Sequence, residues 1–443
     1  MRLRLLKKVL PLTLCLALAF CACGNNTTPV SGDNVVEATE APTAEPTPAP
    51  TPEPTAEPTP APTEVPVDWY QETLNKSILS TGTNGRLEKV VEKIKNGEDV
   101  YISMIGGSVT EGAGATTFAE SYGEQFIFSL QDTYSGSAIH YYNAGLGGTP
   151  STLGLMRYER DVTDVIGTDP DLVIVEFAVN DWEEPTSSRA YEALVRTILE
   201  KENEPAVILL FSVFQSKWNM QDNYIPIGKH YGLPMVSIKD AAAYAYKTNN
   251  VNDDMFFADI YHPTDYGHKI MADCLCELIS RIDTMEVPAE TTPLPDTGKY
   301  DLDFMNMHLV TSKDANGAQI SPGGFNQTDT ALQTFSRTTL AAFPDNWMHT
   351  ADSGNESFTA TMDCKNILLS YKLSSDDDFG FACVYIDGEF VSELFGYQDG
   401  GWNNCNTVLV LDEDTVATHT LEIKMSEGME DFEFTILGIG YTD

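Results

Sequence analysis

Residues 100–112 read VYISMIGGSVTEG, an apolar run that ends in two glycines and a serine. The run from Val100 to Ile105 is short and nearly continuous, which is typical of a strand buried on both faces of a sheet. A serine directly after such a strand lies at the carboxyl edge of the sheet, where open α/β folds place their sites. Glycines beside Ser108 allow backbone N–H groups to approach an anion. Ser108 is therefore the first candidate functional residue of this chain.

Strand and helix patterns alternate on both sides of this stretch. Further short apolar runs lie at 139–143, 172–179, 206–213 and 234–238. Helical patterns lie at 88–95, 122–130, 187–201, 241–247 and 265–282. Strands that alternate with helices predict a parallel sheet covered by helices on both faces. We therefore expect an α/β domain over residues 67–287, a three-layer sandwich around a five-stranded parallel sheet.

The pattern changes after a Pro/Thr-rich connector at 288–297. Strand-like alternation recurs at 367–373, 382–386, 390–394, 407–411, 420–425 and 432–437. Asp387-Gly388 lies between two of these runs and is a strong hairpin signal. These features predict an all-β accessory domain over residues 298–443, and a two-sheet sandwich is the architecture that we expect.

The first residues are typical of an export signal rather than of a folded domain. A basic start precedes an apolar run at 9–20, which has about half of the ~20 residues that a membrane span needs. Residues 20–24 read FCACG and resemble a bacterial lipoprotein box. The resemblance implies a signal peptide over residues 1–23 and a lipid on Cys23, with Cys21 as the alternative. The protein is then expected on the extracellular face of the membrane, held by its lipid anchor only; cleavage and secretion is the alternative.

Composition narrows the possible partners further. Residues 24–66 are rich in Pro, Thr and Glu and predict a disordered linker. The formal net charge is −40, from 66 acidic and 26 basic residues. Such a charge argues against sequence-independent binding to nucleic acid, because that binding depends on basic residues that neutralise phosphates. Beyond the signal, the cysteines are scattered and lack zinc-site spacing, and no H-E-x-x-H motif is present. We therefore expect neither a metal nor a cofactor.

Three more motifs carry polar groups that suit catalysis. Residues 142–149 read YNAGLGGT and can present a free N–H from Gly148, with a tight turn of no function as the alternative. Asn180 follows the apolar run at 172–179, so its amide can face a developing oxyanion or cap the next segment. In Asp259-Ile-Tyr-His262, the carboxylate can hold one imidazole nitrogen while the other takes a proton from a serine.

Three alternative interpretations of these residues have less support from the sequence. The G-x-x-x-x-G-K-[ST] phosphate loop and the G-x-S-x-G elbow are both absent around Ser108. His268 is the nearest rival of His262, but it falls inside the predicted helix at 265–282, which favours a structural role.

Together the four motifs resemble the SGNH (GDSL-like) hydrolase family, whose blocks contribute Ser, Gly, Asn and His in this order. The resemblance covers roughly residues 67–284 and implies a flavodoxin-like α/β fold. The implied catalytic residues are Ser108, His262 and Asp259, and the implied oxyanion hole is formed by Ser108, Gly148 and Asn180. The chain departs from the common family pattern at Gly107, where Asp is usual, and at Ala178, where Gly is usual. The C-terminal stretch is similar to a sandwich appended to some bacterial members.

The resemblance implies a serine esterase that works through an acyl-enzyme. Loops at 110–115 and 181–184 are small or polar, which favours a small acyl group such as acetyl. The predicted surface anchor and added sandwich favour an acylated polysaccharide as substrate. The alternatives are a lipase- or thioesterase-like acylhydrolase, a peptidoglycan O-acetyl esterase, or a non-catalytic carbohydrate-binding lipoprotein. Trp402 and Tyr371 of the sandwich are candidates either for stacking on sugar or for the core.

Overall fold

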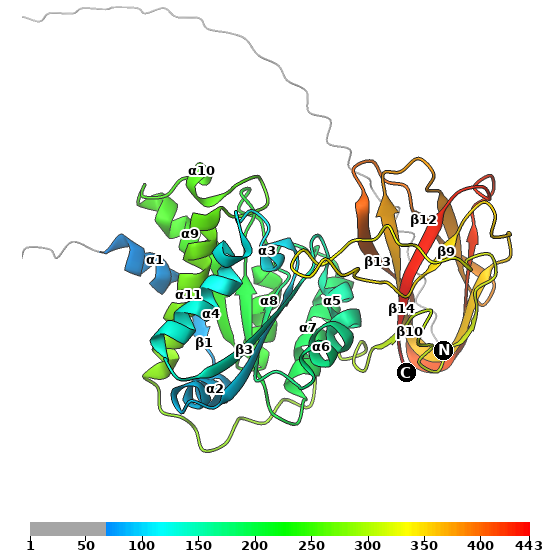
Figure 1. The fold of residues 1–443 in the computed structure, drawn as a ribbon. Helices are drawn as coiled ribbons and strands as arrows, with labels where there is room; N and C mark the ends of the chain where they lie inside the picture. The colour runs from blue at the N-terminus through cyan, green and yellow to red at the C-terminus, as the bar shows by residue number, and fades with distance from the viewer. Residues whose placement is uncertain (1–67) are drawn as a thin grey trace, which may run out of the picture. The chain divides into compact units, whose positions relative to one another are not determined.

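The computed structural model describes residues 68–443. The predicted signal peptide, the lipid site at Cys23 and the linker at 24–66 lie outside the described residues. None of the described helices is both long and apolar enough to cross a membrane. The described residues form an α/β domain followed by an all-β domain, which confirms the predicted fold class (Figure 1).

A six-stranded sheet forms the centre of the α/β domain, with the strand order β1-β6-β5-β4-β2-β3. The five predicted apolar runs form its parallel strands: β2 (Asp99–Gly106), β3 (Ala138–Gly145), β4 (Leu172–Glu176), β5 (Ala206–Phe211) and β6 (Pro234–Ser237). A sixth strand, β1 (Ile78–Thr81), pairs antiparallel with β6 at the edge, so the sheet is mixed. No local pattern marked β1 in advance, because its four residues are all half-buried and show no alternation.

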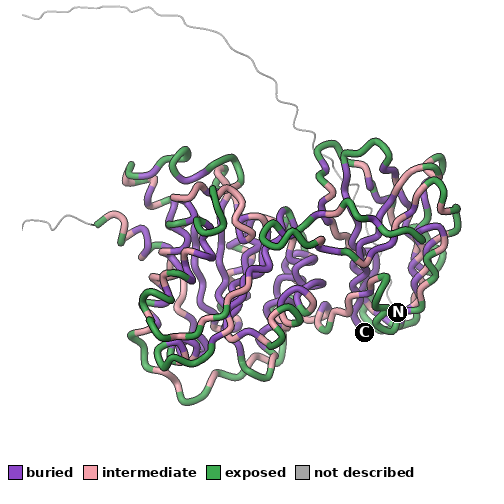
Figure 2. Tube along the Cα trace, viewed as in Figure 1, coloured by how far each residue is buried: buried purple, intermediate pink, exposed green. Residues whose placement is uncertain are grey.

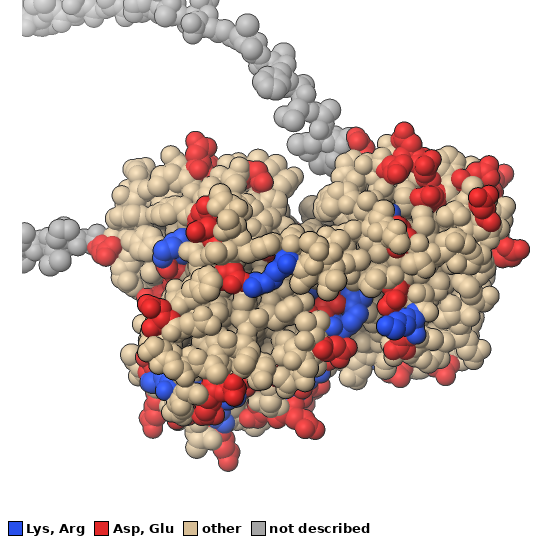
Figure 3. All heavy atoms as spheres, viewed as in Figure 1, with Lys and Arg blue, Asp and Glu red and all other residues tan. Residues whose placement is uncertain are grey.

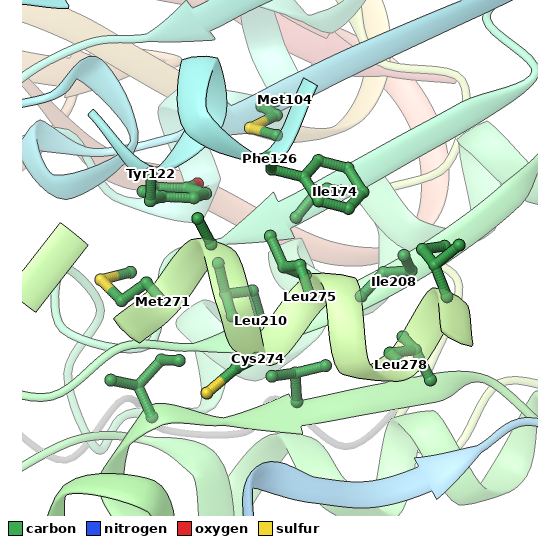
Figure 4. Packing of buried hydrophobic residues seen from close by; sticks show 14 of the residues in the cluster. Met104, Tyr122, Phe126, Ile174, Ile208, Leu210, Met271, Cys274, Leu275 and Leu278 are labelled. Carbon is green, nitrogen blue, oxygen red and sulfur yellow. The ribbon is translucent and has the colours of Figure 1, made fainter. Parts of the chain in front are cut away.

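Helices cover both faces of this sheet. One face carries α1 (Trp69–Ser77), α2 (Arg86–Lys95), α4 (Tyr122–Thr133), α9 (Ile238–Lys247), α10 (Asp253–Phe256) and α11 (Asp265–Asp283). The other carries α5 (Ser151–Tyr158), which runs on through a π-helical turn (Glu159–Thr163) into α6 (Asp164–Ile166), together with α7 (Pro185–Leu199) and α8 (Gln221–His230). Figure 4 shows Met271, Leu275 and Leu278 of α11 among side chains of the sheet and of α4. This burial holds the strand ends in place, and the site lies at those ends.

The all-β domain is built from antiparallel strands. They are β7 (His308–Val310), β8 (Gln319–Ser321), β9 (Trp347–His349), β10 (Phe358–Ser374), β11 (Phe381–Ile386), β12 (Glu389–Phe395), β13 (Trp402–Met425) and β14 (Phe434–Thr442). The first half of β10 pairs with β8 and the end of β13, whereas its second half pairs with β14 and the start of β13. The two long strands therefore run through both layers of the sandwich.

A bulge allows these long strands to change layers. The pairing register of β10 against β13 shifts between Cys364 and Asn366, and such bulges bend a strand. The runs at 407–411 and 420–425, which the sequence suggested as separate strands, belong to the single strand β13. Residues 412–419 between them are mostly exposed, so their sequence lacks the alternation of a half-buried strand. The buried stretches of both domains are purple in Figure 2.

The surface carries the acidity seen in the composition. Figure 3 shows acidic side chains spread over the face that it draws, with few basic ones among them.

Each of the five cysteines among the described residues is a free thiol.

Candidate active site

Ser108 begins α3 (Ser108–Glu111), the short helix that follows β2. The two glycines before it are required by close packing. A Cβ atom at Gly106 would lie 2.4 Å from the backbone oxygen of Glu176, and one at Gly107 would lie 2.1 Å from Oδ1 of Asn180. This packing explains why position 107 holds glycine rather than the usual Asp, because the Asn180 amide occupies the space that a side chain would need.

Ser108, His262 and Asp259 are joined by hydrogen bonds. The Nε2 atom of His262 lies 3.0 Å from Oγ of Ser108, and its Nδ1 lies 2.8 Å from Oδ2 of Asp259. The other carboxylate oxygen of Asp259 accepts from the backbone N–H of Tyr261 at 2.7 Å and of His262 at 2.9 Å. Burial raises the pKa of Asp259, but the hydrogen bonds from His262 and Tyr261 outweigh it and hold the pKa below its ordinary value. An ionised Asp259 fixes Nδ1 as the protonated nitrogen, which leaves Nε2 free to accept the serine proton.

The loop after Ser108 packs closely against the loop that carries His262 and is hydrogen-bonded to the start of α11. Gly114 has a φ of +92°, and a Cβ there would lie 2.1 Å from the backbone oxygen of Pro263. Thr116 donates from its backbone N–H and its hydroxyl to the carboxylate of Asp265, at 2.7 and 2.8 Å. These contacts set the distance between the serine and the imidazole.

His268 strengthens the same junction. It is fully buried, its Nε2 lies 3.0 Å from the backbone oxygen of Ala113, and its Nδ1 accepts from the N–H of Tyr122 at 3.2 Å. Burial lowers the pKa of His268 to about 4, so the ring is neutral at physiological pH. The rival of His262 is thus a structural residue.

The glycine turn after β3 lies next to the serine. A Cβ at Gly147 would be 3.8 Å from Cβ of Ser108, and Gly148 adopts a φ of +66°, which favours glycine. The Oδ1 atom of Asn180 is buried and has no hydrogen-bond partner among residues 68–443. The structure therefore gathers all five residues suggested by the sequence around one point. Three are joined by hydrogen bonds, Asn180 packs against the backbone just before the serine, and Gly148 belongs to the turn that lies beside it.

The all-β domain contributes to this turn. Gln333 donates from Nε2 to the backbone oxygen of Gly147 at 2.7 Å, and its Oε1 accepts from the N–H of Cys405 at 2.9 Å. The ring of Trp402 comes within 3.0 Å of the position that a Cβ on Gly148 would take, yet 58% of this residue is exposed. Tyr371 is instead buried and stacks on Phe434. Of the two aromatic candidates, Trp402 lies at the site and Tyr371 belongs to the core.

A buried carboxyl group lies close to the helix that begins at Ser108. Glu176, at the end of β4, is fully buried and hydrogen-bonded to Ser212 and, at 3.1 Å, to Oγ1 of Thr110. Burial raises the pKa of Glu176 to about 7, against which the hydrogen bonds act only in part. Asp181 is also buried, and burial raises its pKa to about 6; it accepts from the N–H of Ser151 at 2.8 Å. These carboxyls connect α3, β4 and α5 below the site.

A buried arginine forms hydrogen bonds with the ends of β2 and β3. Arg157 of α5 donates from Nη1 to the backbone oxygen of Ala144 at 2.7 Å and from Nη2 to that of Gly106 at 3.2 Å. Its side chain is completely buried and is paired with Asp161 at 3.5 Å. Arg157 thereby joins the end of β2, which leads to the serine, to the end of β3, which leads to the glycine turn.

Sequence reasoning missed several of these supporting residues. A glutamate that ends an apolar strand was a visible signal for Glu176. Nothing in the sequence distinguished Arg157 or Gln333 from surface residues, because their partners are backbone atoms distant in the chain. The loop at 181–184 was interpreted as small or polar, but it contains a large aromatic residue, Trp182, which is 71% exposed.

This chain is similar to known proteins in sequence and in structure. The model of the GDSL-like Lipase/Acylhydrolase family matches residues 104–270. A two-domain esterase (CEX) active on acetylated mannans is similar in structure, with a TM-score of 0.72 and 25% identity over 84% of this chain and 99% of that chain. The crystal structure of that esterase with mannopentaose gives the same TM-score and identity, and 98% of its chain is covered. No curated protein matches this chain.

The matched residues include Ser108, Asn180 and His262, and the similar esterase shares the two-domain layout. Residues 104–270 therefore form a domain of the GDSL-like lipase/acylhydrolase type, and the chain is a carboxylic ester hydrolase.

Proposed function

We propose that this protein removes acetyl groups from a polysaccharide, with Ser108 as nucleophile, His262 as general base and Asp259 as the group that orients the imidazole. The observation that carries the proposal is the hydrogen-bonded series from Ser108 Oγ to His262 Nε2 and from His262 Nδ1 to Asp259. A serine is a weak nucleophile unless an adjacent base takes its proton, and this arrangement supplies one.

In the proposed mechanism, Ser108 Oγ attacks the ester carbonyl carbon as its proton passes to Nε2 of His262. Asp259 stays ionised because its pKa is lowered, so it stabilises the imidazolium that forms. His262 then gives the proton to the departing sugar oxygen, which leaves an acetyl group on the serine. Water attacks this acyl-enzyme with His262 again as base, and acetate and free serine result.

The negative oxygen of each tetrahedral intermediate is assigned to three donors. They are the N–H groups of Ser108 and Gly148 and the side-chain amide of Asn180. The position of Asn180 supports this role, because its side-chain amide packs against Gly107, the residue directly before Ser108. Donors of this kind lower the barrier by stabilising charge that develops only in the transition state.

The polysaccharide substrate is supported by comparison and by the surface around the serine. The structurally similar esterase is active on acetylated mannans and was crystallised with mannopentaose. In this chain Trp402 exposes its ring beside Gly148, where a sugar attached to the reacting ester would lie. Exposed aromatic rings suit the C–H faces of sugar rings.

We further propose that the protein acts outside the cell, attached through a lipid on Cys23. The basic and apolar start of the chain and the lipoprotein-like box support this location. A Pro-rich linker at 24–66 would let the enzyme reach a polymer at a distance from the membrane.

A substrate screen with the mature full-length protein tests the proposal. Acetate release is measured from acetylated mannan and acetylated xylan, and kcat/KM is measured for p-nitrophenyl acetate, butyrate and octanoate. We expect acetate release from at least one polymer and a steep fall in kcat/KM from acetate to octanoate, since each misfitting methylene costs about 1–3 kcal/mol. A preference for octanoate with no release from either polymer would overturn the proposal in favour of a lipase-like enzyme.

A further inference from the structure

A row of aromatic rings leads away from the imidazole of His262. The ring of Tyr261 lies 6.1 Å from that of His262 and 5.1 Å from that of Phe214. Phe214 stacks on Trp218 at 5.9 Å, and Trp218 lies 5.8 Å from Trp182. We call Tyr261, Phe214, Trp218 and Trp182 the aromatic row.

Three loops at the carboxyl edge of the sheet supply these rings. Trp182 follows β4, Phe214 and Trp218 follow β5, and Tyr261 precedes α11. The N–H of Phe214 donates to the backbone oxygen of Trp218 at 3.2 Å, and the N–H of Gln215 donates to that of Ile260 at 3.1 Å. The second of these bonds ties the loop after β5 to the loop of His262. Phe214, Trp218 and Tyr261 are thus held close to His262.

The two ends of the row are open to water. Trp182 is 71% exposed and Tyr261 is 49% exposed, whereas Phe214 and Trp218 are partly buried. Large aromatic surface left in water is unfavourable, so a concentration of it beside a reacting group marks a binding surface. None of the reaction steps described above uses the aromatic row.

We propose that the aromatic row is a binding subsite for the backbone of a linear polysaccharide whose ester group reaches Ser108. This inference rests on the proposed function and extends it along the substrate. Neighbouring rings in the row are separated by 5.1–5.9 Å, comparable to the length of one sugar residue in an extended chain. The exposed carboxylates of Glu183 and Glu184, next to Trp182, can accept hydrogen bonds from sugar hydroxyls.

A neutral sugar chain suits the aromatic row better than other occupants do. A fatty acyl chain needs an enclosed apolar pocket, whereas both ends of this row are exposed. An anionic polymer would be repelled by Glu183 and Glu184 and by the acidic surface as a whole. Trp402, exposed beside Gly148, offers a further ring near the same serine, as expected for a substrate longer than one sugar.

Binding measurements test the subsite separately from catalysis. The affinity of the mature full-length protein for linear β-1,4-linked pentasaccharides of mannose and of xylose is measured by calorimetry. We expect Trp182→Ala to weaken binding about tenfold or more, as truncation of an anchoring tryptophan does, and Trp182→Phe to retain most of it. Phe128→Ala is the matched control, because Phe128 is 52% exposed on α4 and lies outside the row; it should bind as the wild type does.

The esterase assay adds a second readout. Trp182→Ala should lower kcat/KM on the acetylated polymer at least tenfold more than on p-nitrophenyl acetate, since only the polymer reaches the row. The proposal is overturned if the wild type binds neither pentasaccharide, if Trp182→Ala binds as tightly as the wild type, or if it changes only the oligomeric state in size-exclusion chromatography. Failure of the proposed function gives a different result: Trp182-dependent sugar binding with no hydrolysis of any acetyl ester.

Discussion

Replacing Glu176 by glutamine tests whether the buried carboxyl near Ser108 is neutral in the folded protein. Burial raises the pKa of Glu176 from 4.5 to about 7, so the folded state holds this proton more tightly than the unfolded chain does. The stabilisation from protonated Glu176 is therefore fully present below pH 4.5 and is lost as the pH rises through about 7. Linkage over this interval gives a loss of about 2.5 kcal/mol between about pH 5 and pH 8.

A glutamine in place of Glu176 would keep the size and hydrogen-bonding ability of a neutral carboxyl but could not ionise. Its amide can donate through nitrogen and accept through oxygen, so it can keep contacts with Thr110 and Ser212. We expect Glu176→Gln to be stabilised relative to the wild type as the pH rises, by about 2.5 kcal/mol between about pH 5 and pH 8. The buried Asp181 has a pKa raised to about 6 and titrates in both proteins, so its effect largely cancels in the comparison.

The assay is urea unfolding followed by circular dichroism at about pH 5, 6.5 and 8. The quantity compared is the difference in unfolding free energy between variant and wild type at each pH, because the rest of the two-domain chain is common to both. Glu183→Gln, an equal change of charge on an exposed loop residue, is the control and should show no such trend. Parallel pH profiles for the wild type and Glu176→Gln would refute the reasoning.

Three further substitutions address the proposed roles directly. Ser108→Ala should lower kcat on p-nitrophenyl acetate by about 10³-fold or more while the thermal unfolding curve stays unchanged, and a folded, fully active variant would rule out Ser108 as nucleophile. Asn180→Ala should lower kcat by about 10²–10³-fold with little change in KM, whereas a rise in KM alone would assign Asn180 to substrate binding. Cys23→Ala should move the protein from the membrane fraction of its host to the soluble exported fraction; an unmutated protein found wholly in the culture supernatant would contradict the anchor.

Local patterns in the sequence were enough to predict the order of strands and helices in the α/β domain and the residues that meet at its edge. Apolar runs such as 172–179 and the helix pattern at 265–282 are local signals, and each follows from the period of a single element. Ser108, Gly148 and Asn180 could be brought together from sequence because each follows a strand of one parallel sheet, and the ends of such strands share one edge. The Asp259–His262 spacing likewise needs only four consecutive residues.

The surroundings of those residues became known only from the folded chain. The raised pKa of Glu176 depends on burial between several elements, and Arg157 reaches backbone oxygens on two different strands. Gln333 and Trp402 contact the glycine turn although both lie more than 180 residues away from it in the sequence. Trp182, in a loop of mostly acidic residues, gains significance only through its contact with Trp218. Contacts between distant segments leave no period in the sequence, because any one residue of the pair is compatible with many other partners.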